Sequence, residues 1–566
     1  MPSFKKSTSW FWFILCAFLF SLQIIPRWWS DSVILDEDWD LTASYYYFKT
    51  GDVSPLGATA PGALCALPLL CMNLKMDPNV YPKWVDRSHS FLYLQNLDHL
   101  TSMEVWSRFV NWLIGLLIGY LLFRLTQNAP PAENIAAMLL WAFQPTLLAF
   151  GGTAKLDIPT AFWFLLCLMV FNHAQNRNKT FLFAVSGFLA GLCAAARYYG
   201  IFVLPIILIL EIVDWFKTEP RQRNIKDRLV KEMTGIAGFA SAIFLCYLPG
   251  MWTDPSHSWP FHFYINHMMD YKNHIPEIMR GFPTFDGKIW PYSSYLFFPE
   301  QFILKNTTSF VVLLTMGFFL ILTHKLKVPC WIWLSPLVYI GLFWLVSDAG
   351  NGGMNIRHTI PAIPFLILVA AKTFLWFFNA LRNSNSKLIK NLPLLVLLWG
   401  PFSVICNYPH FFAYTNDFIT IRQKPDLLSS FNWSLGQDVK RLAETGRERG
   451  WKRVKFISSG RTDPYYYGLD WQPWSLLDLS SPQPGTVYVI DPCLLKQNSN
   501  YYSMFFRKGS WLESTAPTGN IGGTFYYYEF TGTSVPDNSP VINSFPFYHH
   551  GQPYHPQPNT AFLEVI

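Results

Sequence analysis

Four acidic residues crowd into one short segment near the N-terminus. The sequence from residue 35 reads Leu-Asp-Glu-Asp-Trp-Asp and contains Asp36, Glu37, Asp38 and Asp40. Carboxylates packed together at a membrane surface repel one another, which raises the pKa of at least one of them. A carboxylate with a shifted pKa can act as a general base toward an acceptor hydroxyl or amine. A solvated acidic loop has the same composition, so this segment alone leaves both interpretations open.

Four basic residues occur at the predicted outer ends of apolar segments, where they could bind a phosphate: Lys155, Arg197, Lys305 and Arg357. Arginine favours bidentate phosphate contacts, whereas lysine contributes a point charge. Ordinary interfacial anchors, whose charged ends reach toward water, are the alternative interpretation. Asp157 stands two residues before Pro159 and would either cap a helix or line the site.

The elements that must position these side chains are membrane spans. The chain has 566 residues, of which 51% are hydrophobic and 14% charged, against about 25% charged in an average soluble protein. Many of its 49 Phe, 27 Tyr and 24 Trp residues stand at the ends of apolar runs, as in the interfacial belts of membrane proteins. The net charge of +7 is too small for nucleic-acid binding. This composition excludes a soluble globular enzyme, a disordered chain and a disulfide-stapled secreted domain, and predicts a polytopic α-helical membrane protein.

Eleven segments have the apolar character that a spanning helix of about 20 residues needs. They are 10–27, 107–125, 133–150, 159–175, 180–196, 200–216, 235–252, 308–324, 330–347, 358–379 and 392–408. With a cytoplasmic N-terminus, sixteen Lys and Arg residues fall in inner segments and seven in short outer loops. The positive-inside rule favours this orientation, and an odd number of spans then puts the C-terminus outside.

Two parts of the chain follow from this topology. Residues 1–408 are the predicted membrane domain, with outer loops at 28–106 and 253–307. The apolar segment 61–72 in the first loop is too short to span the membrane and predicts an interfacial or re-entrant segment. Residues 409–566 are a predicted extracytoplasmic α/β domain, with a helix at 436–450 and strands at 454–458, 486–491 and 524–530. The Pro-rich and aromatic-rich tail after 535 should be mostly irregular.

A resemblance becomes visible at the acidic segment. Asp36-Glu37, followed by Ser44, Tyr45, Tyr47 and Gly51-Asp52, resembles the first-loop motif of the family 39 glycosyltransferases. These are GT-C enzymes related to protein O-mannosyltransferases and to the aminoarabinose transferase of lipid A. The resemblance continues in chain order through Pro145, Ala149, Asp157, Gly187, Ala190, Gly191, Leu192, Arg197, Arg357, His358, Pro361, Pro364, Asn432, Gly436, Gln437, Asp438, Asp463, Pro464, Tyr466, Tyr467, Gly468 and 484–488.

Three departures from the family pattern concern the substrates. The chain reads Thr-Ala-Pro-Gly at 59–62 where the family commonly has His-Pro-Pro-Leu, and Arg197 stands where a lysine is common. Ser434 and Leu435 replace the usual Asp and Trp. These differences keep the class and leave the identity of donor and acceptor open.

The resemblance implies an integral membrane glycosyltransferase that takes a hexosyl, mannosyl or pentosyl group from a polyprenyl or dolichyl phosphate. The acceptor would be a protein, lipid or glycan at the periplasmic side of a bacterial inner membrane or in the ER lumen. Asp36 would be the base, with Glu37 beside it shaping the site. The candidate substrate-binding residues are Lys155, Asp157, Arg197, Lys305, Arg357 and His358.

Two further functions are considered beside this one. A transporter or lipid flippase would place ionisable residues near the midpoints of spans, and a non-catalytic scaffold would not need the Asp36-Glu37 pair. The expected partners are membrane lipids, the lipid-linked donor and the acceptor, with no nucleic acid. No tightly bound cofactor is expected, and a divalent metal ion stays open because the acidic loop offers oxygen ligands.

Overall fold

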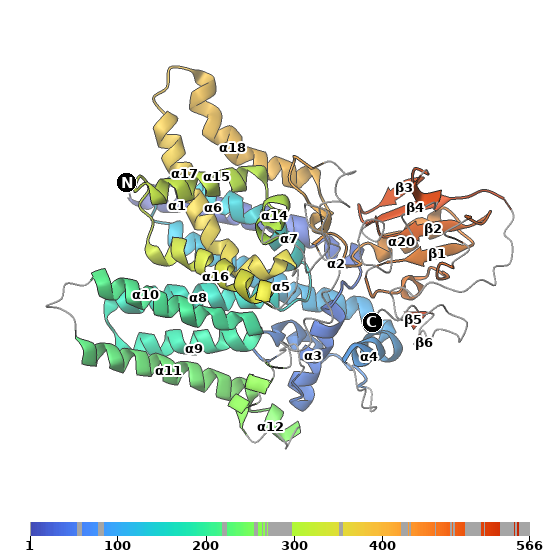
Figure 1. Ribbon diagram of the computed structural model, residues 1–566, viewed down its shortest axis with the longest axis horizontal. Coiled ribbons are helices and arrows are strands. Elements are labelled where there is room, and N and C mark those ends of the chain that lie inside the picture. The colour runs from blue at the N-terminus through green and yellow to red at the C-terminus, as the bar shows by residue number, and fades with distance from the viewer. Residues whose placement is uncertain are drawn as a thin grey trace.

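A bundle of long helices forms most of the molecule, with a small mixed sheet beyond one end of it (Figure 1). The structure is a computed structural model. Helices α2 to α4 of the first outer loop lie at the end of the bundle nearer the sheet, and the N-terminus lies toward the opposite end. The described residues are 2–53, 59–76, 84–217, 224–253, 259–262, 264–266, 269, 297–349, 355–419, 428, 432–458, 460–475, 478, 481–492, 511–513, 515–532, 548–549 and 552–553.

Each of the eleven predicted spans coincides with an apolar helix or, in one case, with a bent pair of helices. Seven in the described residues are long and apolar enough to cross: α1 (Pro2–Ile24), α5 (Leu100–Thr126), α8 (Asp157–Arg177), α10 (Val203–Lys217), α11 (Ile225–Tyr247), α17 (Ile363–Leu381) and α18 (Lys387–Cys406), some counted with a flanking turn. An eighth span is a pair bent by 50°, α6 (Pro131–Ala142) and α7 (Pro145–Gly151). Three shorter apolar helices are α9 (Thr180–Ala196), α15 (Thr308–Leu322) and α16 (Cys330–Ala349). The polytopic helical fold is confirmed, and crossing by all eleven segments stays a prediction.

Small residues allow α9 to pack directly against the backbone of α11. A Cβ atom placed on Gly187 of α9 would lie 1.9 Å from the carbonyl oxygen of Gly235 in α11. Membrane helices use such small residues to approach closely, because they gain no hydrophobic free energy from leaving lipid. This contact holds the middle of α9 against α11, and Arg197 directly follows the last residue of α9.

The first outer loop folds as a compact unit on top of the bundle. It contains α2 (Arg27–Ser30), α3 (Glu37–Thr50), the 3-10 helix η1 (Ala63–Cys71) and α4 (Trp84–His89). The segment at 61–72, predicted to be interfacial or re-entrant, forms η1, which packs between α3 and α5. Ala63, Cys65, Ala66 and Leu69 are buried there, whereas Leu67 and Cys71 are exposed. Contact of this exposed face with the membrane stays a prediction.

The C-terminal region, residues 409–532, contains a four-stranded sheet with the strand order β1-β2-β4-β3. Strands β1 (Val454–Ile457) and β2 (Val487–Ile490) are parallel, and β4 (Phe525–Glu529) runs antiparallel to β2. Helix α20 (Val439–Glu448) packs against the sheet through Val439, Leu442 and Ala443. These elements confirm the predicted helix and three strands.

The remaining predictions for this region have different outcomes. Strand β3 (Gly519–Ile521), which pairs with β4, was not predicted. Most of the tail after residue 535 lies outside the described residues, apart from a short hairpin of β5 (Tyr548–His549) and β6 (Gln552–Pro553). The division of the chain at residue 408 stays a prediction.

Backbone hydrogen bonds join the C-terminal region to the first outer loop. The amide of Ser32 donates to the carbonyl of Gln437 at 3.0 Å, and the amide of Leu35 donates to that of Leu435 at 2.7 Å. The Ser32 hydroxyl donates to the carbonyl of Gly436 at 2.6 Å. The segment that leads into the acidic cluster is therefore held by residues about four hundred positions later in the chain.

Candidate active site

Asp36 stands at the turn into α3, surrounded by positive charge. Its backbone is left-handed, with φ of 63°, a conformation that aspartate tolerates better than most residues. Arg357 Nη2 lies 2.9 Å from Asp36 Oδ2, Lys155 Nζ lies 3.5 Å from the same oxygen, and Arg461 Nη2 lies 3.8 Å from Oδ1. The Asp36 side chain is 18% exposed, whereas its partner Lys155 is fully buried. Asp36 and Arg461, whose side chain is 22% exposed, are thus where this charged group opens to the surroundings.

Asp40, one turn further along α3, extends the same network inward. Its carboxylate contacts Lys155 Nζ at 3.1 Å and Arg197 Nη1 at 3.0 Å. Lys155 therefore bridges the two aspartates, which face the same side because they are four residues apart on a helix. The connected ion pairs join these two carboxylates with four cations, called the cation cluster below: Lys155, Arg197, Arg357 and Arg461.

The two neighbouring aspartates at 36 and 38 have opposite pKa shifts. Burial alone would raise the pKa of the Asp36 carboxyl, but Lys155, Arg357 and Arg461 outweigh burial and hold this pKa well below its usual range. For Asp38, burial dominates and raises the pKa, and the charge of Asp36 adds to the rise. The increase predicted from crowding therefore falls on Asp38, and Asp36 stays ionised because of its cations.

Glu37 is bound on every side by protein groups. Arg108 of α5 donates Nε and Nη2 to its two oxygens, both at 3.0 Å. The backbone amides of Ala154 and Ile34 donate to the same carboxylate at 2.8 and 3.0 Å. Glu37 is only 2% exposed, so its oxygens have no room for a substrate. It holds the loop in position, which agrees with the shaping role expected for it.

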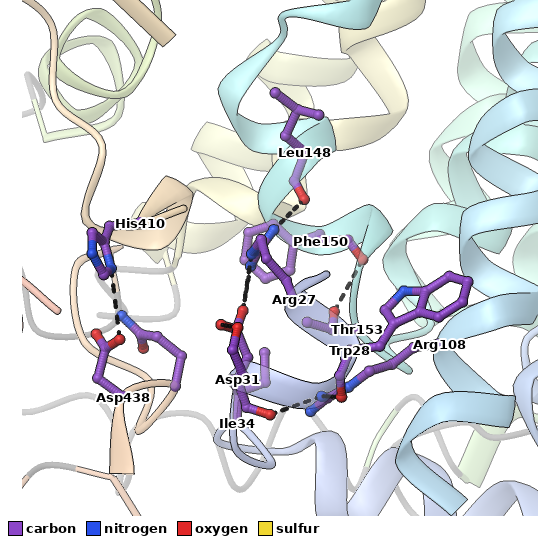
Figure 2. Close-up of polar contacts among 12 residues, drawn as sticks. Arg27, Trp28, Asp31, Ile34, Arg108, Leu148, Phe150, Thr153, His410 and Asp438 are labelled. Carbon is purple, nitrogen blue, oxygen red and sulfur yellow. Dashed lines mark hydrogen bonds and ion pairs between the residues drawn. The ribbon is translucent and has the colours of Figure 1, made fainter. Parts of the chain in front are cut away.

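Two arginines also hold the segment between α2 and α3 (Figure 2). Arg27 donates to the Asp31 carboxylate at 2.9 Å and to the carbonyl of Leu148 at 2.7 Å. Arg108 donates to the carbonyls of Trp28 and Asp31 at 3.0 and 2.9 Å. Because charge-assisted hydrogen bonds are stronger than neutral ones, these contacts fix the direction in which Asp36 leaves the bundle. Neither arginine was among the predicted site residues.

Asp157 and His358 lie beneath the cation cluster. Asp157 is the first residue of α8 and makes no capping hydrogen bond, so the capping interpretation is wrong. Its carboxylate accepts instead from the hydroxyl of Tyr199. The His358 ring stacks on Phe343 with centroids 5.2 Å apart and meets the edge of Tyr199 at 5.1 Å. Asp157 and His358 are buried close enough to Arg357 and Arg197 to interact with them electrostatically.

Lys305 is not brought into the cluster. This residue ends α14 (Phe297–Lys305), and its Nζ donates to the carbonyls of Phe412 and Tyr414, both at 2.7 Å. Its contacts tie the start of the C-terminal region to the bundle. The fourth cation of the cluster is Arg461, which was not predicted. The one feature of the sequence that could have indicated it is its position two residues before the Asp463-Pro464 motif.

Metal-ligating side chains were also sought around the acidic loop. Within the part of the chain that the structure describes, no group of three or more His, Cys, Asp and Glu residues is placed to hold a metal ion. The acidic residues instead have basic or hydroxyl partners, as shown for Asp36, Asp40 and Asp157.

A buried histidine makes the junction with the C-terminal region sensitive to acid. His89 of α4 shares a 2.9 Å hydrogen bond with the Tyr466 hydroxyl, and burial lowers the pKa of His89 from 6.5 to about 3. Below pH 6.5 His89 therefore binds a proton in the unfolded chain, whereas in the folded protein it stays neutral until about pH 3. The free energy of unfolding is therefore unaffected by His89 above pH 6.5 and decreases as pH falls from 6.5 toward 3, by up to about 1.4 kcal/mol per pH unit.

We expect the thermal midpoint of the purified protein to fall between pH 7.5 and pH 5, and His89→Gln to reduce this fall. Exposed His99 of the same loop provides the matched control, and His99→Gln should leave the pH dependence unchanged. An undiminished pH dependence in the His89→Gln protein would show that other groups cause it.

Comparisons with known proteins relate the chain to membrane glycosyltransferases. Residues 98–248 match the family model of the dolichyl-phosphate-mannose-protein mannosyltransferases. The structure is similar to ArnT from Cupriavidus metallidurans bound to undecaprenyl phosphate, with 11% identity, 91% of this chain and 97% of that chain covered, and a TM-score of 0.43. It is also similar to the oligosaccharyltransferase AglB from Archaeoglobus fulgidus in complex with an inhibitory peptide and a dolichol-phosphate, with 12% identity, coverages of 97% and 78%, and a TM-score of 0.44. None of the curated proteins matches the sequence.

The family match covers the part of the chain that contributes much of the site. Arg108, Lys155, Asp157 and Arg197 lie inside residues 98–248, whereas Asp36 lies before this segment. The match is confined to residues 98–248 of the 566-residue chain, and the helices around it have the length and composition of a polytopic membrane protein.

Proposed function

We propose that the protein transfers a sugar from a polyprenyl or dolichyl phosphate to an acceptor at the extracytoplasmic face of the membrane. The observation that carries the proposal is the cation cluster around Asp36, at the end of the bundle that faces the sheet. A phosphate leaving group needs positive charge, and the connected ion pairs supply four cations for two carboxylates.

The chemistry requires one base and one stabilised leaving group. In the proposed step, the Asp36 carboxylate takes the proton of the acceptor hydroxyl or amine, and the freed electron pair forms the new bond to the anomeric carbon of the sugar. The bond from this carbon to the phosphate oxygen breaks, and its electron pair leaves with the lipid phosphate. The phosphate therefore gains one negative charge as Asp36 loses one.

This exchange of charge couples the two ends of the reaction. In the resting protein Asp36 competes for Arg357 and Lys155, which lie 2.9 and 3.5 Å from its oxygen. Protonation of Asp36 weakens both ion pairs at the moment when the phosphate becomes more negative. The same cations then stabilise the transition state more than the ground state, which is what accelerates a reaction.

The test is transfer by the purified protein in liposomes. Polyprenyl phosphates that carry a mannosyl, another hexosyl or a pentosyl group would each be offered with peptide, lipid and glycan acceptors, and mass spectrometry would follow the acceptors. We expect one donor class to yield a glycosylated acceptor and free polyprenyl phosphate in equal amounts. Movement of the lipid-linked sugar across the bilayer without transfer would favour the flippase instead.

Arg357 should be needed mainly for use of the donor. Arg357→Ala removes a charge-assisted contact, and such contacts contribute about 1.5–3 kcal/mol. We therefore expect the donor KM to rise about ten- to a hundredfold, with a smaller rise for Arg197→Ala because Arg197 contacts Asp40 rather than Asp36. Steady-state kinetics would measure both. Exposed Arg449 is the control, and an unchanged donor KM in Arg357→Ala would make this residue a structural partner of Asp36 only.

A further inference from the structure

Arg461 reaches the site from the C-terminal region rather than from the helical bundle. We infer that Arg461 is a substrate-binding residue that holds the phosphate of the lipid carrier through guanidinium N–H groups that have no hydrogen-bond partner among the described residues. The inference rests on the proposed function and assigns the C-terminal region a direct part in donor binding.

The chain fixes the place of Arg461 from both sides. The hydroxyl of Thr462 donates to the carbonyl of Val33 at 2.5 Å, next to the acidic segment. On the other side, a Cβ atom on Gly460 would lie 3.1 Å from the Cα of Gly436, so the two backbones are in close contact. Arg461 thus sits on a short segment held between the first outer loop and the residues that pair with it.

Two nitrogen atoms of the Arg461 guanidinium are buried without a hydrogen-bond partner among the described residues. Its Nη2 lies 3.8 Å from Asp36 Oδ1, beyond hydrogen-bond distance. Its Nε and Nη1 atoms are buried and have no hydrogen-bond partner among the described residues, and the same holds for Nε of Arg357. Burying a charged donor without a partner costs free energy. Such a group in a folded protein calls for an explanation, and an unoccupied ligand position is one.

An anion with several oxygens fits these donors. The planar guanidinium fork matches phosphate geometry, and bidentate contacts of this kind are strong. Arg461 is also the cation held most loosely by the aspartates, because Arg357 and Lys155 approach Asp36 more closely. It can therefore turn toward a phosphate at the smallest loss of existing contacts. Once Asp36 is protonated, Arg461 loses its ion pair with this carboxylate.

Binding of undecaprenyl phosphate, measured without any transfer, tests the inference. The proteins are the wild type, Arg461→Gln, Arg461→Lys and the control Arg449→Gln, and neutral undecaprenol is the second ligand. Arg449 suits the control because it is 47% exposed on the same region and pairs with Glu529 at 3.3 Å, away from the cluster. Affinities would be measured by ligand-induced thermal shift and native mass spectrometry.

We expect Arg461→Gln to weaken undecaprenyl phosphate binding about ten- to a hundredfold, the scale of one charged hydrogen-bonding group. Arg461→Lys should restore part of the loss, because it keeps the charge without the fork. Arg449→Gln should match the wild type, and undecaprenol should bind all four proteins equally. In transfer assays the loss in Arg461→Gln should appear in the donor KM more than in kcat.

Wild-type affinity for undecaprenyl phosphate in Arg461→Gln would overturn the inference, as would an equal loss of undecaprenol binding. If Arg461→Gln does not fold, the affinity of Arg461→Lys tests the inference instead. A well-folded lysine variant with wild-type affinity for undecaprenyl phosphate would rule out recognition by the guanidinium fork. A wild-type protein that neither binds the phosphate lipid nor transfers sugar would contradict the proposed function itself. Normal wild-type transfer with an unaffected Arg461→Gln protein would contradict only this inference.

Discussion

Replacing Asp36 with asparagine should reduce turnover about 10²–10⁴-fold, the usual contribution of a general base. Asparagine keeps the shape of the side chain but cannot take the acceptor proton. The structure adds a second expectation for the same protein. Asp36 competes with the donor phosphate for Arg357 and Lys155, so the neutral asparagine should leave donor affinity unchanged or increased. A fall in kcat without a rise in donor KM is therefore the signature of this variant.

Asp98→Asn is the matched control for this prediction. Asp98 lies in the same outer loop and is exposed, so the identical chemical change there should leave turnover near the wild-type value. Full turnover in a folded Asp36→Asn protein would contradict the assignment. The base would then be sought at Asp38, whose pKa burial raises and the charge of Asp36 raises further.

The second large effect is expected at Glu37, and it concerns stability rather than chemistry. Glu37→Gln removes the nearer carboxylate of a buried ion pair and leaves Arg108 with the more distant carboxylate of Glu104, at 3.9 Å. Removing one partner of a buried pair typically lowers the free energy of unfolding by about 3–5 kcal/mol. We therefore expect a clear fall in the thermal midpoint of the detergent-solubilised protein. Turnover per folded molecule should fall less than in Asp36→Asn, since Glu37 has no oxygen free for a substrate.

Exposed Glu444 on α20 offers the comparison for Glu37. Glu444→Gln should melt like the wild type because water, rather than a buried arginine, surrounds its carboxylate. Two results would contradict the prediction: unchanged melting of Glu37→Gln, or a loss of turnover in folded Glu37→Gln as large as in Asp36→Asn.

The fold was largely predictable because its strongest signals are local. A spanning helix needs a continuous apolar run, and each of the eleven runs falls on an apolar helix. The helix and three strands of the C-terminal region have clear periodicity, whereas β3 is three residues long and contains a glycine and an asparagine. The packing of the 61–72 segment against α3 and α5 could not be predicted, because its apolar composition suits a membrane surface and a protein interior equally well.

Site residues could be predicted where a charged side chain stands next to the end of a predicted span. Asp36, Lys155, Arg197 and Arg357 were expected from their types and their places at helix ends, and the structure brings them into one network. Arg461 could not be found in this way, because it lies far from any span and reaches Asp36 only through tertiary packing. Lys305 has the same type and position as the other cations, and only the fold shows that it binds backbone carbonyls instead.

The hydrogen bonds between the first outer loop and the C-terminal region also set an order of events during synthesis. The Ser32 hydroxyl and its acceptor carbonyl are 404 residues apart. At about 5–20 residues per second, the ribosome needs about 20–80 s to make the intervening chain. Until residue 436 has been made, the segment before Asp36 lacks these pairing partners. Arg357 is made before that point and Arg461 after it. A newly made molecule therefore cannot complete the cation cluster until residue 461 has been made, late in its own translation.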